Sequence, residues 1–161
     1  VLFGGGQERS LRSGTENLSG IAGFGAAAEA AMHELETDTW RRVERLRDQL
    51  EDAIVAASPD TICVGKDDDR LPNTGCLVSP GWKGETQVMQ MDLAGYAISA
   101  GSACSSGKVR DSRVLRAMGY GEIDSRSAIR VSLGPTTTED EIMGFVDAWS
   151  AAYERYKKRA A

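Results

Sequence analysis

The sequence predicts an α/β fold, a small α+β domain in which a helix pair leads into a small mixed sheet covered by further helices. Residues 18–57 are rich in alanine and contain no proline, which favours helix over most of this stretch. Four short β-prone runs follow, at 61–64, 73–78, 96–98 and 127–133, with helical segments between them. The length of 161 residues is sufficient for one ordinary domain with a hydrophobic core.

Composition and charge exclude several classes of function. The net charge of −5 argues against non-specific nucleic-acid binding, which needs a basic face. No apolar run approaches the ~20 residues that span a bilayer, so we expect a soluble protein with no membrane partner. The three cysteines show no C-x-x-C spacing, which favours neither a disulfide framework nor a zinc site and suits a reducing cytoplasm.

Residues 4–17, GGGQERSLRSGTEN, form a polar, glycine-rich stretch that contains Arg9 and Arg12. Glycine amides, hydroxyl groups and guanidinium groups are the donors that a phosphate or carboxylate needs. An ordinary solvated loop, with Thr15 or Asn17 as the cap of the next helix, explains the same residues.

The helical stretch 18–57 divides at residues 37–39. After this point Trp40, Val43, Leu46, Leu50 and Ile54 follow a spacing of three or four residues, and we expect arginine and glutamate on the opposite face. The single histidine, His33, precedes the break, and we interpret it as a surface residue.

The middle of the chain predicts two strands, at 61–64 and 73–78, and a helix at 85–93 whose methionines face the core. A third strand is expected at 96–98. Asp67–Asp69 lacks the ligand spacing of a calcium loop, so we expect a solvated turn. Cys63 and Cys76 are expected to be small buried side chains.

Residues 99–108, SAGSACSSGK, surround Cys104 with small residues that bury little apolar surface, which favours a mobile loop. Lys108 and Arg110 follow, and Asp111–Ser112 predicts the N-cap of a helix over 112–118. Nearby cations and a helix N-terminus lower the pKa of a cysteine, so Cys104 is a candidate nucleophilic thiol.

The last part of the chain predicts a strand at 127–133 and a long helix to about Lys158. Ala128, Arg130 and Ser132 alternate with Ile129, Val131 and Leu133. A charged residue in the middle of a strand is costly unless it is solvated or paired, so Arg130 either reaches an exposed edge or binds an anion. Thr138 and Glu141 have the spacing of a capping box.

The stretches GGGQERSLRSGTEN, SAGSACSSGK and AIRVSLGPTTTEDEI, in this order, resemble the C-terminal part of the NifS/IscS-type cysteine desulfurases. These are pyridoxal-phosphate (PLP) enzymes related to the class V aminotransferases. The likeness implies the C-terminal portion of a PLP-dependent transferase fold. It assigns residues 1–36 to the end of a large cofactor domain and its connecting helix, and residues 37–161 to a small C-terminal domain that carries the cysteine loop.

The resemblance implies roles for three residues. Cys104 matches the cysteine that takes the sulfur of L-cysteine as a persulfide while L-alanine leaves. Thr15 matches the threonine that reaches the cofactor phosphate of the other subunit in a homodimer, and Arg130 matches the arginine that holds the substrate carboxylate. The sulfur passes to an acceptor, often an iron–sulfur scaffold protein, with which Cys104 is implied to act as a transient metal ligand.

The family's cofactor-binding lysine lies in its N-terminal part, and this sequence contains no Ser-x-His-Lys motif. The chain, which begins with Val1, is therefore expected to be a fragment that is inactive alone and an enzyme in its full-length form. Two alternatives stay open. One is a non-catalytic persulfide carrier or scaffold-binding remnant without a PLP domain, which would not need Thr15 or Arg130. The other is an enzyme that acts on selenocysteine.

Overall fold

The structure is a computed structural model that describes residues 4–100 and 111–160. The chain divides into two compact units, Val1–Asp38 and Thr39–Ala161. Each unit is described by itself. Cys104 lies outside the described residues, so its predicted role stays a prediction.

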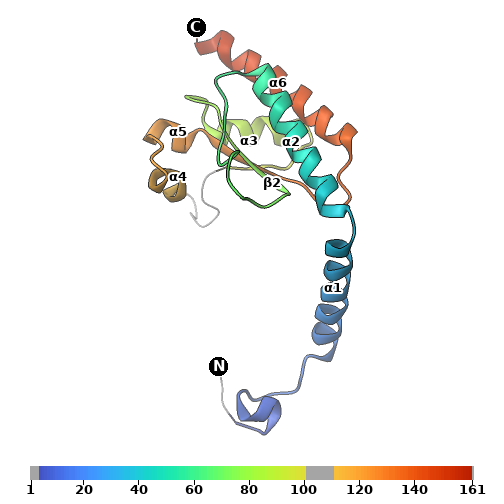
Figure 1. Ribbon diagram of the computed structural model, residues 1–161. Coiled ribbons are helices and arrows are strands. Elements are labelled where there is room, and N and C mark those ends of the chain that lie inside the picture. The colour runs from blue at the N-terminus through green and yellow to red at the C-terminus, as the bar shows by residue number, and fades with distance from the viewer. Residues whose placement is uncertain (1–3, 101–110, 161) are drawn as a thin grey trace. The chain divides into compact units, whose positions relative to one another are not determined.

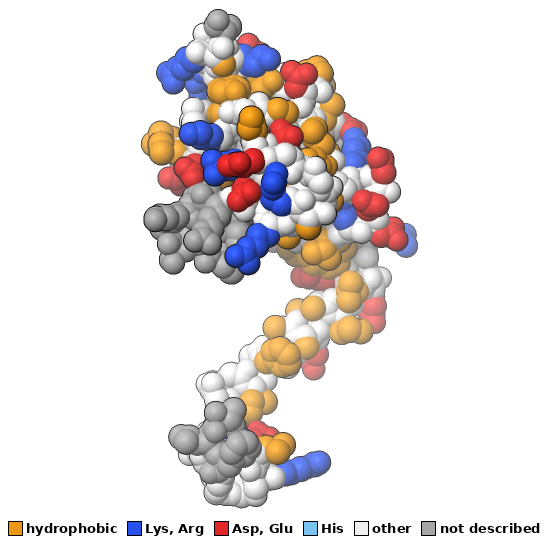
Figure 2. All heavy atoms as spheres, turned by 90° about the vertical axis from the view of Figure 1, so that its left-hand side faces the viewer, with side chains coloured by type: hydrophobic (Ala, Val, Ile, Leu, Met, Phe, Trp, Pro, Cys, Tyr) orange, Lys and Arg blue, Asp and Glu red, His pale blue; other side chains and the backbone are white. Residues whose placement is uncertain are grey.

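The first unit contains a 3₁₀ turn, η1 (Gln7–Ser10), and one helix, α1 (Leu18–Glu36). Asn17 is the N-cap of α1, because its side-chain oxygen accepts a hydrogen bond from the amide of Gly20 at 3.1 Å. No side chain of α1 is buried, and apolar residues such as Phe24 are exposed along it (Figure 2). His33 is exposed, as predicted.

The second unit is built on a four-stranded sheet in the order β1-β2-β4-β3. The strands are β1 (Ile62–Cys63), β2 (Thr74–Val78), β3 (Ser99–Ala100) and β4 (Ala128–Ser132). Each described strand pair is antiparallel, whereas the sequence had predicted a mixed sheet. The long central pair β2–β4 places Cys76 opposite Arg130.

Three helices cover one face of the sheet: α2 (Thr39–Ala57), α3 (Gly84–Leu93) and α6 (Glu139–Ala160). In Figure 1, α2 and α6 lie side by side. Ile129 and Val131 of β4 pack in the main core with apolar residues of these helices, such as Leu50 and Trp149. The alternation predicted for β4 is therefore confirmed.

The opposite face carries a smaller cluster. Ala128 of β4 and Val78 of β2 pack there against Leu115 of α4 (Arg113–Ala117). Ser112 caps α4 as predicted, since its hydroxyl accepts a hydrogen bond from the amide of Leu115. A further short helix, α5 (Glu122–Arg126), contacts α4 and was not predicted.

Two predictions about helix faces are wrong in part. In α3, Met91 is fully buried but Met89 is 65% exposed, because Gly84, Gln87 and Met91 form the buried face. In α2, Arg47 and Glu51 lie among the buried residues rather than on the solvent side. Both are paired, Arg47 with Asp48 and the carbonyl of Leu71, and Glu51 with Arg70.

The third strand begins later than predicted. Residues 96–98 make no regular structure, and the pairing of β3 with β4 comprises Ser99 and Ala100. None of the helices in the described part of the chain combines the length and apolarity that a bilayer crossing requires.

Candidate functional site

Arg130 lies in the middle of β4, an inner strand of the sheet, and its side chain is exposed on the face opposite the three covering helices. The sequence predicted that Arg130 either reaches an exposed edge of the sheet or binds an anion. In the structure, β4 is not an edge strand. Within the described part of the chain, its guanidinium group makes no hydrogen bond or ion pair. Its five N–H donors are therefore available to an anion or to water.

A cavity of about 420 Å³ opens beside Arg130. It is lined by Cys76 of β2, by Ser112 and Arg113 at the start of α4, and by apolar residues that include Leu115 and Met118. The cavity combines two guanidinium groups with a hydroxyl and an apolar wall. That donor set suits a small molecule that carries a carboxylate.

Cys76 is the neighbour that sequence reasoning assigned to the core and that the structure places half-buried beside Arg130. Burial raises the pKa of this thiol, although the positive charge of Arg130 acts in the opposite direction. The thiol is therefore neutral near pH 7 and leaves the charge of Arg130 uncompensated. The register of β2 and β4 brings these two residues together. They are 54 positions apart in the sequence, and no local pattern indicates that they are neighbours.

The turn before α1 places Thr15 at the surface of the first unit. Its hydroxyl group makes no hydrogen bond to any residue in the described part of the chain. The sequence left open whether Arg12 binds an anion or belongs to an ordinary solvated loop, and in the structure its guanidinium group contacts its own chain. It donates to the backbone carbonyls of Gly14 and Thr15 and pairs with Glu8.

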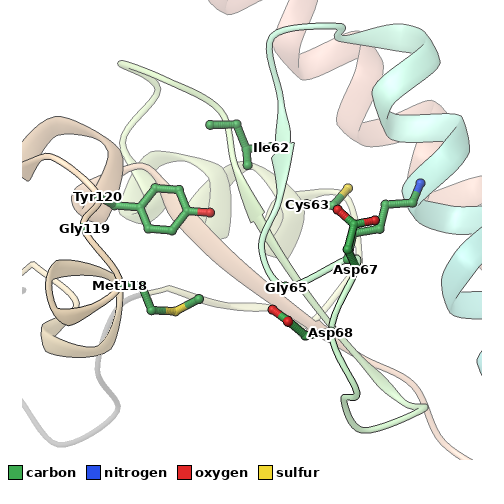
Figure 3. A pocket seen from close by; sticks show the side chains of 9 residues that line it. Ile62, Cys63, Gly65, Asp67, Asp68, Met118, Gly119 and Tyr120 are labelled. Carbon is green, nitrogen blue, oxygen red and sulfur yellow. The ribbon is translucent and has the colours of Figure 1, made fainter.

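A second cavity, of about 440 Å³, lies between the turn after β1 and the end of α4 (Figure 3). Its lining includes Cys63, Asp67, Asp68 and the ring of Tyr120, but none of the predicted site residues. Burial, followed by the negative charge of Glu51, raises the pKa of the Cys63 thiol to about 11. This cavity therefore holds a poorly reactive thiol rather than a nucleophile.

The acidic turn 67–69 is exposed, in agreement with the predicted solvated turn. In residues 4–100 and 111–160, no group of three or more histidine, cysteine or acidic residues is arranged to hold a metal ion.

Comparison with known proteins gives consistent matches over nearly the whole chain. A cysteine desulfurase NifS from Azotobacter vinelandii is 42% identical over 142 residues, which are 88% of this chain and 35% of that protein. A cysteine desulfurase from a Nostoc species is 40% identical over 157 residues, 98% of this chain and 39% of the relative. The chain thus spans well under half the length of these relatives.

Solved structures agree. The crystal structure of a NifS-like protein from Rickettsia africae superposes with a TM-score of 0.82 and 33% sequence identity. The match covers 96% of this chain and 39% of that structure. This similarity confirms the predicted α/β fold class, in which helices cover a small sheet, and the strand pairs of that sheet are antiparallel rather than mixed.

The sequence pattern described as Aminotransferase class-V matches residues 5–145, a range that includes the Thr15 turn, the whole sheet and Arg130. Since this range is most of the chain, and since the sequence relatives and the superposed structure point the same way, the chain belongs to the aminotransferase class-V family.

Proposed function

We propose that the full-length protein carrying this chain is a PLP-dependent cysteine desulfurase that converts L-cysteine to L-alanine and holds the released sulfur as a persulfide. Membership of the aminotransferase class-V family and the cysteine desulfurases among the relatives support this proposal. In it, residues 1–36 belong to the cofactor domain and its connecting helix, and residues 37–161 form the small domain.

Arg130 is the main support for the proposal, because its guanidinium group has no partner among the described residues and borders a cavity large enough to admit an amino acid. We assign it the α-carboxylate of L-cysteine. Two charge-assisted hydrogen bonds from one guanidinium group fix both oxygens of a carboxylate and so orient the substrate. The neutral Cys76 thiol keeps this charge available for the substrate.

Thr15 fits the phosphate of the cofactor. A phosphate needs hydrogen-bond donors and positive potential. The hydroxyl of Thr15, which has no partner among residues 4–100 and 111–160, belongs to a residue two positions before the N-cap of the 19-residue helix α1. In the proposed homodimer, Thr15 donates this hydroxyl to the phosphate held by the other subunit. PLP, when bound, withdraws electrons from the substrate and makes its carbon–sulfur bond easier to break.

Cys104 is the proposed nucleophile. Its thiolate attacks the substrate sulfur, a sulfur–sulfur bond forms, and the carbon–sulfur bond breaks with its electron pair remaining on the substrate carbon. Protonation of that carbon gives L-alanine. The outer sulfur then passes to an acceptor thiol, for which we propose an iron–sulfur scaffold protein with which Cys104 transiently shares a cluster. Cys63 and Cys76 are free thiols, which supports a reducing cytoplasm as the compartment.

The kinetics of Arg130→Ala in the full-length protein test this assignment. We expect the KM for L-cysteine to rise about 10- to 100-fold, the effect of losing hydrogen bonds to a charged group, with a smaller change in kcat. Inhibition by cysteamine, which lacks the carboxylate, is expected to stay unchanged. Arg126→Ala is the matched control, because this exposed arginine pairs with Glu122 at 2.8 Å and lies outside the cavity lining.

A normal KM in Arg130→Ala would remove the carboxylate role. Cys104→Ser is expected to abolish sulfur release while the absorbance of bound PLP remains. Unchanged turnover in that variant would remove Cys104 from the mechanism.

A further inference from the structure

Arg12 is directed at the backbone of the turn that follows it. One of its terminal nitrogens, Nη1, donates to the carbonyl oxygen of Gly14 at 2.5 Å and to that of Thr15 at 3.3 Å, and it also approaches the carbonyl of Ser13 at 3.5 Å. A single guanidinium group thus holds consecutive carbonyls of a three-residue turn. Its side chain is half-buried by this arrangement.

The position of the guanidinium group is itself supported. Its second terminal nitrogen, Nη2, lies 3.6 Å from a carboxylate oxygen of Glu8, four residues earlier in the chain. Glu8 belongs to η1, where Glu8, Arg9 and Ser10 all have positive φ angles of 50–65°. A left-handed backbone is unfavourable for residues with a Cβ, and the Arg12–Glu8 ion pair is one contact that links this segment to the 13–15 turn.

These contacts set the orientation of Thr15. The carbonyls of the turn face Arg12, and in a trans peptide the following amide points the opposite way, so the amides of Thr15 and Glu16 face away from the guanidinium group. On the other side of Thr15, the Asn17 cap fixes the start of α1. Thr15 is therefore held from both directions, while its own hydroxyl group stays without a partner among the described residues.

We propose that Arg12 is a positioning residue for the phosphate site: it holds the 13–15 turn so that Thr15 presents its hydroxyl to the phosphate of the cofactor. This inference rests on the proposed function and adds a residue to it. The positive charge of Arg12 acts on carbonyl oxygens of its own chain, and the phosphate is contacted by Thr15. Loss of Arg12 therefore weakens phosphate binding through Thr15.

The test is the affinity of the full-length apoprotein for PLP and for pyridoxal, which lacks the phosphate, measured by absorbance titration. In Arg12→Ala we expect the Kd for PLP to rise about tenfold, the usual effect of losing one charge-assisted interaction, while the Kd for pyridoxal stays unchanged. Arg9→Ala is the matched control. It removes the same charge from the same segment, but the side chain of Arg9 is exposed and makes no hydrogen bond or ion pair within the described residues.

A double-mutant cycle with Thr15→Val separates positioning from direct contact. If Arg12 acts through Thr15, then Arg12→Ala adds less than a twofold effect in the Thr15→Val background. Additive effects would show that Arg12 acts independently of Thr15 and would overturn the inference, as would an equal loss in Arg9→Ala. Arg12→Lys, which keeps a donor and the charge, is expected to bind PLP with intermediate affinity, and it serves in place of Arg12→Ala should that variant not fold.

The cycle also distinguishes failure of the inference from failure of the proposed function. If Thr15→Val weakens PLP binding and Arg12→Ala does not, the phosphate site stands and the positioning role falls. If the wild-type protein binds PLP no better than pyridoxal, both fall.

Discussion

Arg70→Met is the substitution whose cost the structure defines best. The guanidinium group of Arg70 donates two hydrogen bonds of 2.6 Å to the two carboxylate oxygens of Glu51, whose side chain is fully buried in α2. This pairing raises the pKa of Arg70. The substitution leaves a carboxylate in the interior without its cation.

The expected loss is about 3–5 kcal/mol in the free energy of unfolding, the cost of leaving one buried charge unpaired. For a domain with a total stability of about 5–15 kcal/mol, this is a large fraction. Glu51→Gln is expected to cost less, because the side chain of Arg70 is 16% exposed and can still reach water. The double variant Arg70→Met with Glu51→Gln is expected to regain most of the loss, since it contains no buried charge.

Urea unfolding of this chain, followed by tryptophan fluorescence, measures all three variants. The reasoning is refuted if Arg70→Met costs less than about 1 kcal/mol, the range of an exposed ion pair. It is equally refuted if Glu51→Gln fails to rescue Arg70→Met. The pair also lies next to the site, because Gly75, the neighbour of Cys76 in β2, packs against the Glu51 carboxylate so closely that a Cβ at this position would lie 3.0 Å from Oε1 of Glu51.

Three further predictions concern single contacts. Gln87→Leu is expected to lower the free energy of unfolding in urea by about 3 kcal/mol. It removes the hydrogen bonds that Gln87 makes to the carbonyls of Trp82 and Ser127 and accepts from the indole N–H of Trp149. A loss under about 1 kcal/mol would show that these hydrogen bonds contribute little to stability. Thr138→Ala is expected to lower stability by about 1 kcal/mol by removing the α6 capping box, with Thr136→Ala as a control that leaves the cap intact. At pH 8, iodoacetamide is expected to label Cys63 roughly a hundredfold more slowly than a free cysteine, since the thiolate is the reactive form, and the rate is expected to rise with pH until about 11. Peptide mass spectrometry measures the labelling rate of Cys63 separately from those of the other cysteines. Equal labelling rates for Cys63 and free cysteine would show that the pKa of the Cys63 thiol is not raised.

Local signals in the sequence predicted the elements that local physics determines. The spacing of Val43, Leu46, Leu50 and Ile54 marked the buried face of α2, and the Thr138–Glu141 capping box marked the start of α6. The alternation around Arg130 identified both faces of β4.

The errors arose where partners distant in the sequence decide burial. Glu51 is buried because Arg70 reaches it from the loop between β1 and β2, and Gln87 is buried because Trp82, Ser127 and Trp149 satisfy its amide. Periodicity alone assigns such polar residues to the solvent face and places Met89 on the buried face of α3, where Gln87 lies instead.

For the candidate site too, some features could be predicted from the sequence and others depend on the fold. A strand arginine that lacks an obvious partner is visible in the sequence, and so is a polar loop before a helix. The proximity of Cys76 to Arg130 follows from the β2–β4 register, and the inward direction of Arg12 follows from the backbone of the 13–15 turn. Neither feature has a signature in spacing or composition.

The central claim is that this chain supplies the sulfur-accepting cysteine and the carboxylate-binding arginine of a cysteine desulfurase. Incubation of the full-length protein with PLP and L-cysteine, followed by amino-acid analysis and mass spectrometry of the proteolysed protein, tests it directly. We predict one L-alanine for each persulfide, with the mass of one added sulfur atom on the peptide that contains Cys104. A protein that forms no alanine, or that forms alanine while its added sulfur is found on Cys63 or Cys76, would contradict the account.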